Sequence, residues 1–265
     1  MQKSLDQHLN RKNFRQILFI GGLMLLWELL AQIGHFPPLL FPSFSNVAKE
    51  LFVQTVSGEI LARTAFSLYL IGIGLFLAII SALAITAIAV CSSLVSEWVQ
   101  VLMAVLHPLP GIAILPIIIL WLGTGPQSIL AVIWFSALWP LVANLNTGLH
   151  SIPATQIEVG KNLGLRGFAL VGTVLLPGAF PYILSGLRIG WARAWQAAVA
   201  AEMVFGASGG EGGLGWFIYK KRFFMEISSV FAGLIVIVLI GLLIERLCFE
   251  SIEIRTVRRW GMTVN

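Results

Sequence analysis

Uncharged apolar runs as long as a bilayer is thick dominate this sequence. Residues 65–90 and 98–122 contain no Lys, Arg, Asp or Glu, and residues 129–145 are a shorter run of the same kind. A helix needs about 20 apolar residues to cross the roughly 30 Å hydrocarbon core of a bilayer. With 58% hydrophobic and only 11% charged residues, a chain of 265 residues has too little polar surface for a soluble protein. The sequence therefore predicts an all-α membrane protein.

Six membrane spans are predicted within a single transmembrane domain that covers residues 1–265. They lie at residues 17–33, 65–90, 98–122, 129–145, 183–205 and 230–247. Prolines in the third and fourth spans remove backbone donors, so they predict kinks there. These prolines are Pro108, Pro110, Pro116 and Pro140.

The distribution of Lys and Arg indicates the orientation. With six spans, both termini lie on the same side, and the segments on that side hold ten of the seventeen basic residues, whereas the opposite loops hold five. The positive-inside rule then places both termini in the cytoplasm. Lys220, Lys221 and Arg222 count against this orientation, in a Gly-rich outer loop at residues 206–226 that either touches a partner or is a solvated turn.

A polar segment at residues 150–182 separates the fourth and fifth spans. Ser151 and Pro153 predict a helix start, because a hydroxyl can cap free amides and proline is tolerated in the first turn. Gly164 is expected to end this helix and Gly167 to begin another. Such a helix–turn–helix on the cytoplasmic surface suits docking into a groove of a soluble partner. An amphipathic helix at the membrane interface is the alternative.

The spacing of residues in this segment is specific. Glu158-Val159-Gly160, Gly164 and Val174-Leu175-Leu176-Pro177 follow the pattern E-A-A, three residues, Gly, nine residues, Ile-x-Leu-Pro. This chain resembles the permeases of binding-protein-dependent ABC importers, whose cytoplasmic loop carries that pattern. It departs from the family at Val159 and Gly160, where alanines are usual, and glycine there costs about 1 kcal/mol of helix propensity.

Further segments resemble the nitrate, taurine and aliphatic-sulfonate branch of these permeases. They are FPPLLFPS at 36–43, LWLG at 120–123, LPGAFP at 176–181, GLR at 186–188, AAE at 200–202, GLG at 213–215 and RRW at 258–260. The branch is known for small anions such as nitrate, sulfonates, taurine or bicarbonate, and it also includes permeases for vitamins and other small solutes.

The resemblance implies a type I ABC importer fold with a coupling helix between transmembrane helices 4 and 5. It implies a homodimer of this subunit in the bacterial inner membrane, two ATPase subunits, and an extracytoplasmic solute-binding protein. The ATPase-coupling residues would be Glu158, Gly160, Lys161, Gly164, Arg166, Leu176 and Pro177. The chain has no Walker A pattern, so we expect no enzyme activity or cofactor in it, and ATP and Mg in the partner ATPase subunit.

The fifth span carries Arg188, Arg193 and Glu202, and charges at bilayer depth usually face a cavity or a partner. At 100° per residue, Arg188, Trp195 and Glu202 share one face, whereas Arg193 points elsewhere. These three residues are the candidate translocation path. The alternative is that Arg188 binds a lipid phosphate or a loop carboxylate near the cytoplasmic end, while Glu202 snorkels to the other interface.

Small residues recur at every fourth position of the same span, namely Gly186, Gly190, Ala194 and Ala198. Such rows allow close helix contact, so they predict dimer packing through the fifth span.

Other functions have little support in the sequence. A stand-alone secondary transporter or channel would need its own coupling-ion site, for which only Glu28, Glu202 and Arg188 are available. Cys91 and Cys248 have no metal-ligand spacing, and His107 is interpreted as a packed polar residue. No basic stripe indicates nucleic-acid binding.

Overall fold

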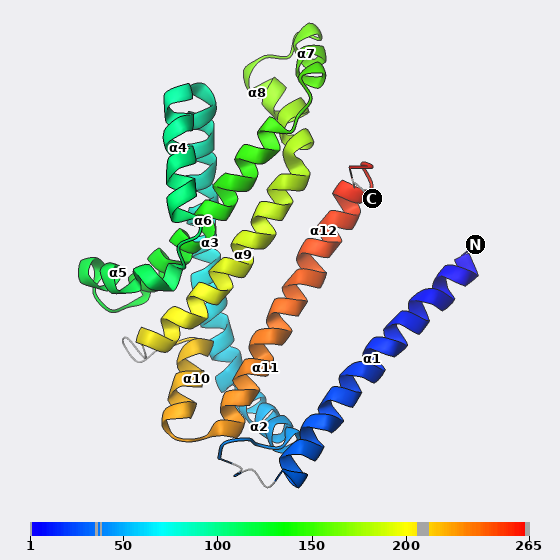
Figure 1. The fold of residues 1–265 in the computed structure, drawn as a ribbon, viewed down its shortest axis with the longest axis vertical. Helices are drawn as coiled ribbons and strands as arrows, with labels where there is room; N and C mark the ends of the chain where they lie inside the picture. The colour runs from blue at the N-terminus through cyan, green and yellow to red at the C-terminus, as the bar shows by residue number, and fades with distance from the viewer. Residues whose placement is uncertain (1, 35–36, 38, 206–211, 263–265) are drawn as a thin grey trace. The chain divides into compact units, whose positions relative to one another are not determined.

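The computed structural model describes residues 2–34, 37, 39–205 and 212–262, and this part of the chain is helical, without strands (Figure 1). Two parts of the sequence predictions lie outside the described residues. They are Phe36 and Pro38 of the FPPLLFPS segment, and residues 206–211 of the predicted outer loop. Two compact units divide the chain. The smaller unit comprises Met1–Leu61 and Phe217–Val236, and the larger comprises Ala62–Trp216 and Ile237–Asn265.

The smaller unit contains two complete helices and parts of three others. The complete helices are α1 (Gln2–Ile33) and α2 (Phe44–Val56), and the others are α3 (Glu59–Cys91), α10 (Leu214–Phe223) and α11 (Ile227–Ile244), which continue into the larger unit. Trp27 joins α1 to the rest, because its ring lies 5.5–6.3 Å from the rings of Phe41, Phe44 and Phe231. Its indole Nε1 donates to the carbonyl of Pro42 at 3.1 Å.

Glu28, the one charge in the first predicted span, is engaged within the same unit. Its carboxylate accepts hydrogen bonds from the backbone N–H and the hydroxyl of Ser45, each at 3.0 Å. Ser43 caps α2 by accepting from the N–H of Asn46. A carboxylate at a helix N-terminus is favoured by the helix dipole, so Glu28 stabilises the start of α2.

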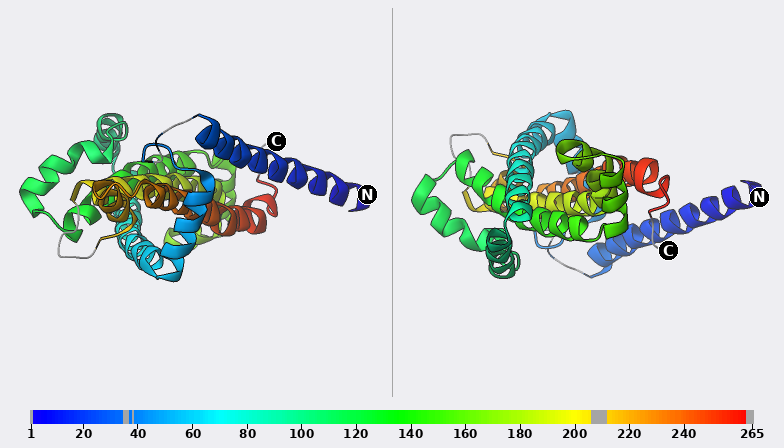
Figure 2. Two further views of the ribbon diagram at one scale, coloured as in Figure 1. Left: turned by 90° about the horizontal axis from the view of Figure 1, so that it is seen from below. Right: turned by 90° about the horizontal axis from the view of Figure 1, so that it is seen from above.

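The larger unit is built around the pair α6 and α9. Its helices are most of α3, then α4 (Ser93–Leu106), η1 (Gly111–Ile114), α5 (Leu115–Leu122), α6 (Pro126–His150), α7 (Ala154–Asn162), α8 (Gly167–Leu170), η2 (Val171–Leu175), α9 (Leu176–Phe205), the start of α10, the end of α11, η4 (Glu245–Glu250), α12 (Ser251–Glu253) and η5 (Ile254–Arg258). The segments η2, η4 and η5 are π-helical turns. Helices α6 and α9 lie side by side along most of their length (Figures 1 and 2).

The row of small residues on α9 makes this close contact possible. Gly186, Gly190, Ala194 and Ala198 are all buried within the single chain. A Cβ added at Gly186 would lie 2.8 Å from Cβ of Asn144, and one at Gly190 would lie 3.3 Å from Cγ of Leu141. Both neighbours belong to α6, so the row packs inside one subunit. Dimer packing through these residues stays a prediction.

We expect Gly186→Ala to lower the melting temperature of the detergent-solubilised protein, because overpacking a tight contact costs about 1–3 kcal/mol. Gly241→Ala is the matched control, since a Cβ at Gly241 would meet nothing within 4 Å. The measurement is thermal unfolding followed by tryptophan fluorescence. Equal melting temperatures for the two variants would contradict the close α6–α9 contact.

The third predicted span is broken rather than merely kinked. The segments Ser93–Leu106 and Gly111–Leu122 meet at 91°, and Figures 1 and 2 show α4 and α5 running in different directions. Pro108 and Pro110 lie in the break between them. The kink predicted from these prolines is therefore a full break of the helix, because two prolines two positions apart leave the backbone without helical donors.

The other two prolines do not break a helix. Pro116 lies in the first turn of α5, where its missing N–H has no helical acceptor to lose. Pro140 lies inside α6, which continues through it.

Within the described residues, four segments are individually long and apolar enough to cross a membrane, and the bent pair would make a fifth. The four are Phe14–Ile33, Glu59–Cys91, Pro126–His150 and Ile227–Arg258. Helix α9 is 30 residues long but carries three charged side chains. The count of six spans stays a prediction.

Candidate functional site

The predicted coupling loop folds as α7, a short helix between α6 and α8 at one end of the α6–α9 pair (Figure 1). It begins at Ala154, directly after Pro153, as the sequence indicated. Ser151 does not cap it, because the Ser151 hydroxyl donates to the carbonyl of Gly148 at 2.8 Å. Ile152 is 7% exposed and packs where a Cβ at Gly178 would stand, which anchors the loop to the start of α9.

Gly164 follows the end of α7, where the sequence predicted that the helix stops. Its φ is +82°, in the left-handed region that favours glycine. The N–H of Gly164 donates to the carbonyl of Lys161, and the N–H of Leu165 donates to the carbonyl of Gly160, each at 3.0 Å. These two bonds form a Schellman motif, which satisfies carbonyls at the end of the helix. Gly167, with a φ of +52°, begins α8.

Gly160 is buried against the segment that follows α7. A Cβ at Gly160 would lie 2.8 Å from Cδ1 of Leu170 and 3.0 Å from Cγ2 of Val174. This close approach gives a physical reason for glycine where related loops have alanine. It also fixes α7 onto α8 and η2, which lead directly into α9.

The outer face of α7 combines charge with exposed apolar surface. Val159 and Leu163 are 57% and 76% exposed, and Glu158 is exposed beside them. Lys161 and Arg166 are exposed as well, and neither they nor Glu158 form an ion pair within the described part of the chain. We call Glu158, Val159, Lys161, Leu163 and Arg166 the outer face of α7.

A groove of about 420 Å³ runs between α7 and the start of α9. Val159, Leu163 and Pro177 are among the residues that line it. Leu176, the other predicted coupling residue at this end of α9, is 43% exposed.

Arg188 is held by two carboxylates from the C-terminal segment. Its Nε lies 3.0 Å from Oε1 of Glu245, and its Nη2 lies 3.0 Å from Oε2 of Glu253. The guanidinium also lies 5.8 Å from the ring centroid of Phe249. Glu253 pairs in addition with Arg258 at 3.1 Å. Pairing with carboxylates is the alternative that the sequence left open for Arg188.

Glu202 is 1% exposed and accepts hydrogen bonds from two directions. The hydroxyl of Ser67 on α3 lies 2.8 Å and 3.0 Å from its two oxygens, and the N–H of Gly215 donates to Oε2 at 2.8 Å. Ser67 Oγ itself accepts from the N–H of Leu214 at 2.9 Å. The alternative that Glu202 snorkels to the interface does not hold, since its polar partners lie inside the protein.

The residues of the predicted translocation path are not brought together. Arg188 and Glu202 both belong to α9, but each has its own set of partners outside this helix. Trp195 is 7% exposed and stacks on Trp191, with ring centroids 5.9 Å apart. Their role in transport stays a prediction.

A cavity of about 190 Å³ in the larger unit was not predicted from the sequence. It lies between the end of α4, η1, α6 and α9. Its polar lining residues are His107, Ser136, Trp139, Arg193 and Gln196. Arg193 could have indicated it, because this charged residue of the fifth span points away from the face of Arg188 and Glu202.

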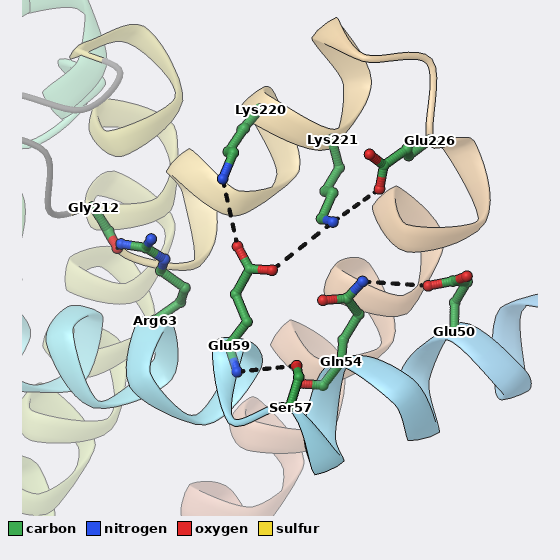
Figure 3. Close-up of polar contacts among 9 residues, drawn as sticks. All are labelled: Glu50, Gln54, Ser57, Glu59, Arg63, Gly212, Lys220, Lys221 and Glu226. Carbon is green, nitrogen blue, oxygen red and sulfur yellow. Dashed lines mark hydrogen bonds and ion pairs between the residues drawn. The ribbon is translucent and has the colours of Figure 1, made fainter.

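The basic residues of the predicted outer loop lie on helix α10 rather than in a loose turn. In the smaller unit, Glu59 lies 3.8 Å from the ammonium groups of both Lys220 and Lys221, and Lys221 also pairs with Glu226 at 2.8 Å (Figure 3). Glu50 accepts from the hydroxyl of Ser229 at 3.2 Å. The start of α3 is thus tied to α10 and to the turn before α11.

Residues 71–248 match the family described as the binding-protein-dependent transport system inner membrane component. The chain belongs to this family. The matched residues include the whole of α7, its anchoring segments and α9. The protein is accordingly an ABC transporter permease, which is a non-catalytic membrane subunit.

Individual permeases are similar over most of their length. The chain is 28% identical to the taurine transport system permease protein TauC of Escherichia coli over 244 residues, which cover 89% of this chain and 86% of TauC. It is 29% identical to the nitrate import permease protein NrtB of Synechocystis over 250 residues, with coverage of 89% and 86%.

The fold is that of a type I ABC importer permease. A chain of the inward-facing MetNI methionine ABC transporter superposes with a TM-score of 0.58 at 18% identity, covering 73% of this chain and 94% of that one. Among the described residues, no group of three His, Cys, Asp or Glu side chains could hold a metal ion.

Proposed function

We propose that this permease forms the path for a small anion, which a solute-binding protein delivers, and that the outer face of α7 couples the path to an ATPase. The observation that carries the proposal is this face, where exposed Val159 and Leu163 stand beside the unpaired charges of Glu158, Lys161 and Arg166. An exposed apolar pair rimmed by charges is typical of a docking surface. The names of the relatives, taurine and nitrate permeases, favour a small solute that carries an oxyanion group.

The rigidity of the loop supports a mechanical role. The Schellman motif at Gly164 and the contact of Gly160 with Leu170 fix α7 onto α8. From there the chain continues through the π-helical turn η2 into α9 without a flexible connection. Movement of a docked ATPase subunit would therefore displace α7 and the cytoplasmic end of α9 together.

The complete importer would contain two copies of this permease, two ATPase subunits that bind ATP and Mg, and an extracytoplasmic solute-binding protein. The excess of Lys and Arg on one side favours cytoplasmic termini in a bacterial inner membrane. Lipid would cover the apolar outer surface of the helices.

The test of coupling is Glu158→Ala. We expect ATP hydrolysis stimulated by the loaded binding protein to fall about tenfold, because one charge at the docking surface is lost. The melting temperature of the permease should not change, since Glu158 is exposed. The measurement is ATP hydrolysis and solute uptake in reconstituted vesicles.

Glu250→Ala is the control, because Glu250 is also an exposed glutamate but lies far from α7 in the sequence. Wild-type stimulation in Glu158→Ala would contradict the docking role of this residue. Solute uptake by the permease without an ATPase subunit would instead favour a stand-alone secondary transporter.

A further inference from the structure

The cavity beside Arg193 has three walls that bring polar groups to one place. Helix α9 contributes Arg193 and Gln196 together with Ala197 and Ala200, which share one face at helical spacing. The second wall is α6. The third is the break between α4 and α5, which includes His107.

Arg193 differs from Arg188 in having no carboxylate partner among the described residues. No ion pair or hydrogen bond of its guanidinium occurs among the residues that the structure describes, and its side chain is exposed within the single chain. An arginine in a membrane helix is costly unless it meets water, a counter-charge or a ligand. Arg193 is thus a fixed positive charge that is available to an anion.

Neighbouring donors would complete such a site. The side chains of Gln196 and His107 have no hydrogen bond in the described part of the chain, and both line the cavity. Trp139 also lines it, and its indole Nε1–H is buried without an acceptor there. Charge-assisted hydrogen bonds from a guanidinium, supported by neutral donors, are the usual way in which proteins bind oxyanions.

The backbone of the third wall approaches α6 closely. A Cβ at Gly111 would collide with the side chain of Ser136, so only glycine allows the break to close this side of the cavity. Pro140 has no N–H, so the carbonyl of Ser136 lacks its helical donor and can accept a hydrogen bond from water.

The size and depth of the cavity indicate a small solute. Pockets for drug-sized ligands measure about 300–1,000 Å³, whereas this one measures about 190 Å³. At a rise of about 1.5 Å per residue, Arg193 lies roughly 26 Å from Leu176 and roughly 18 Å from Phe205, the two ends of α9. Lipid headgroups lie at the helix ends, so they are not expected at this depth.

We propose that Arg193, with Gln196, His107 and the indole of Trp139, forms a transient site on the translocation path for the oxyanion group of a small solute, such as nitrate or a sulfonate. This inference rests on the proposed function, because it identifies where the transported anion would be bound.

Transport is the first test, with nitrate and taurine as probes in vesicles that contain the complete importer. Arg193→Met should lower uptake about tenfold, as expected for losing a hydrogen bond to a charged group. Arg193→Lys should retain most of the uptake, because it keeps the charge. Arg255→Met is the control for loss of an exposed arginine. Undiminished uptake by Arg193→Met would overturn the site.

Thiol reactivity is the second test and does not require transport. In a Cys91→Ser, Cys248→Ser background, Ala200→Cys places a thiol in the cavity lining. A sulfonate-bearing methanethiosulfonate reagent should react with it about tenfold faster than a trimethylammonium analogue. Arg193→Met should remove this preference, and nitrate should slow the anionic reagent.

The two tests separate failure of the site from failure of the proposed function. If the reagent preference depends on Arg193 while wild type transports neither probe, the anion site holds and the proposed transport of these anions fails. If transport occurs but the reagents show no preference, the site fails. Protection by added phosphatidylglycerol instead of nitrate would assign the site to a lipid phosphate and would overturn the proposal.

Discussion

Gly164→Val should abolish ATP-driven uptake while leaving the membrane helices folded. A non-glycine residue in the left-handed conformation costs about 1–2 kcal/mol, and a β-branched side chain is especially unfavourable there. At a φ of +82°, valine would force the chain out of the Schellman motif. The bonds from Gly164 to Lys161 and from Leu165 to Gly160 would then be lost. Helix α7 would no longer be held against α8.

The strain at Gly164 is one of backbone conformation and not of space. A Cβ there would meet nothing within 4 Å, so a side chain at this position would not collide with its surroundings. Gly164→Asn should therefore retain coupling, because asparagine tolerates the left-handed region. Gly172→Ala is the control, since a Cβ at Gly172 would also meet nothing within 4 Å but the φ of this residue is not positive. Uptake and ATP hydrolysis should be measured together; coupled transport by Gly164→Val would refute this role of the turn.

Glu202→Ala should prevent the permease from reaching a stable fold. The change removes the acceptor for the hydroxyl of Ser67 and for the N–H of Gly215, both of which are buried. Each buried group that is left without a partner costs about 1–3 kcal/mol, which together is a large part of the stability of a protein. Glu202→Gln keeps one oxygen acceptor, so its effect should be intermediate.

The yield of monodisperse protein in detergent and its melting temperature measure this effect. Glu97→Ala, at an exposed glutamate of α4, should match wild type. The double variant Ser67→Ala, Glu202→Ala should lose less stability than the sum of the losses in the two single variants, because the two side chains share one hydrogen-bond network. A normal melting temperature for Glu202→Ala would show that the network does not stabilise the fold.

Local features of this permease could be predicted from the sequence. The turns at Gly164 and Gly167 follow from the backbone freedom of glycine, which does not depend on distant residues. The long apolar helices follow from hydropathy, for the same reason. The small-residue row on α9 predicted a close helix contact, but the partner is α6 of the same chain. Spacing along one helix carries no information about which helix packs against it.

Features that depend on distant residues could not be predicted. The prolines of the third span indicated a kink, but the 91° break also involves the contact of Gly111 with Ser136 on α6. The hydrogen-bond partner of Glu202 could not be predicted, because Ser67 lies 135 residues away in the sequence. The cavity beside Arg193 is lined by three segments that are separate in the sequence.

The order of synthesis gives the bond between Ser67 and Glu202 a consequence for biogenesis. Ser67 leaves the ribosome 135 residues before Glu202, so α3 is already available when the carboxylate of α9 must enter the bilayer. Arg63, one turn before Ser67, then donates to the carbonyl of Gly212 at 2.9 Å (Figure 3). Leu214 and Gly215 follow within a few residues and supply their N–H groups. We therefore expect α3 to serve as the template beside which the charged helix α9 is inserted.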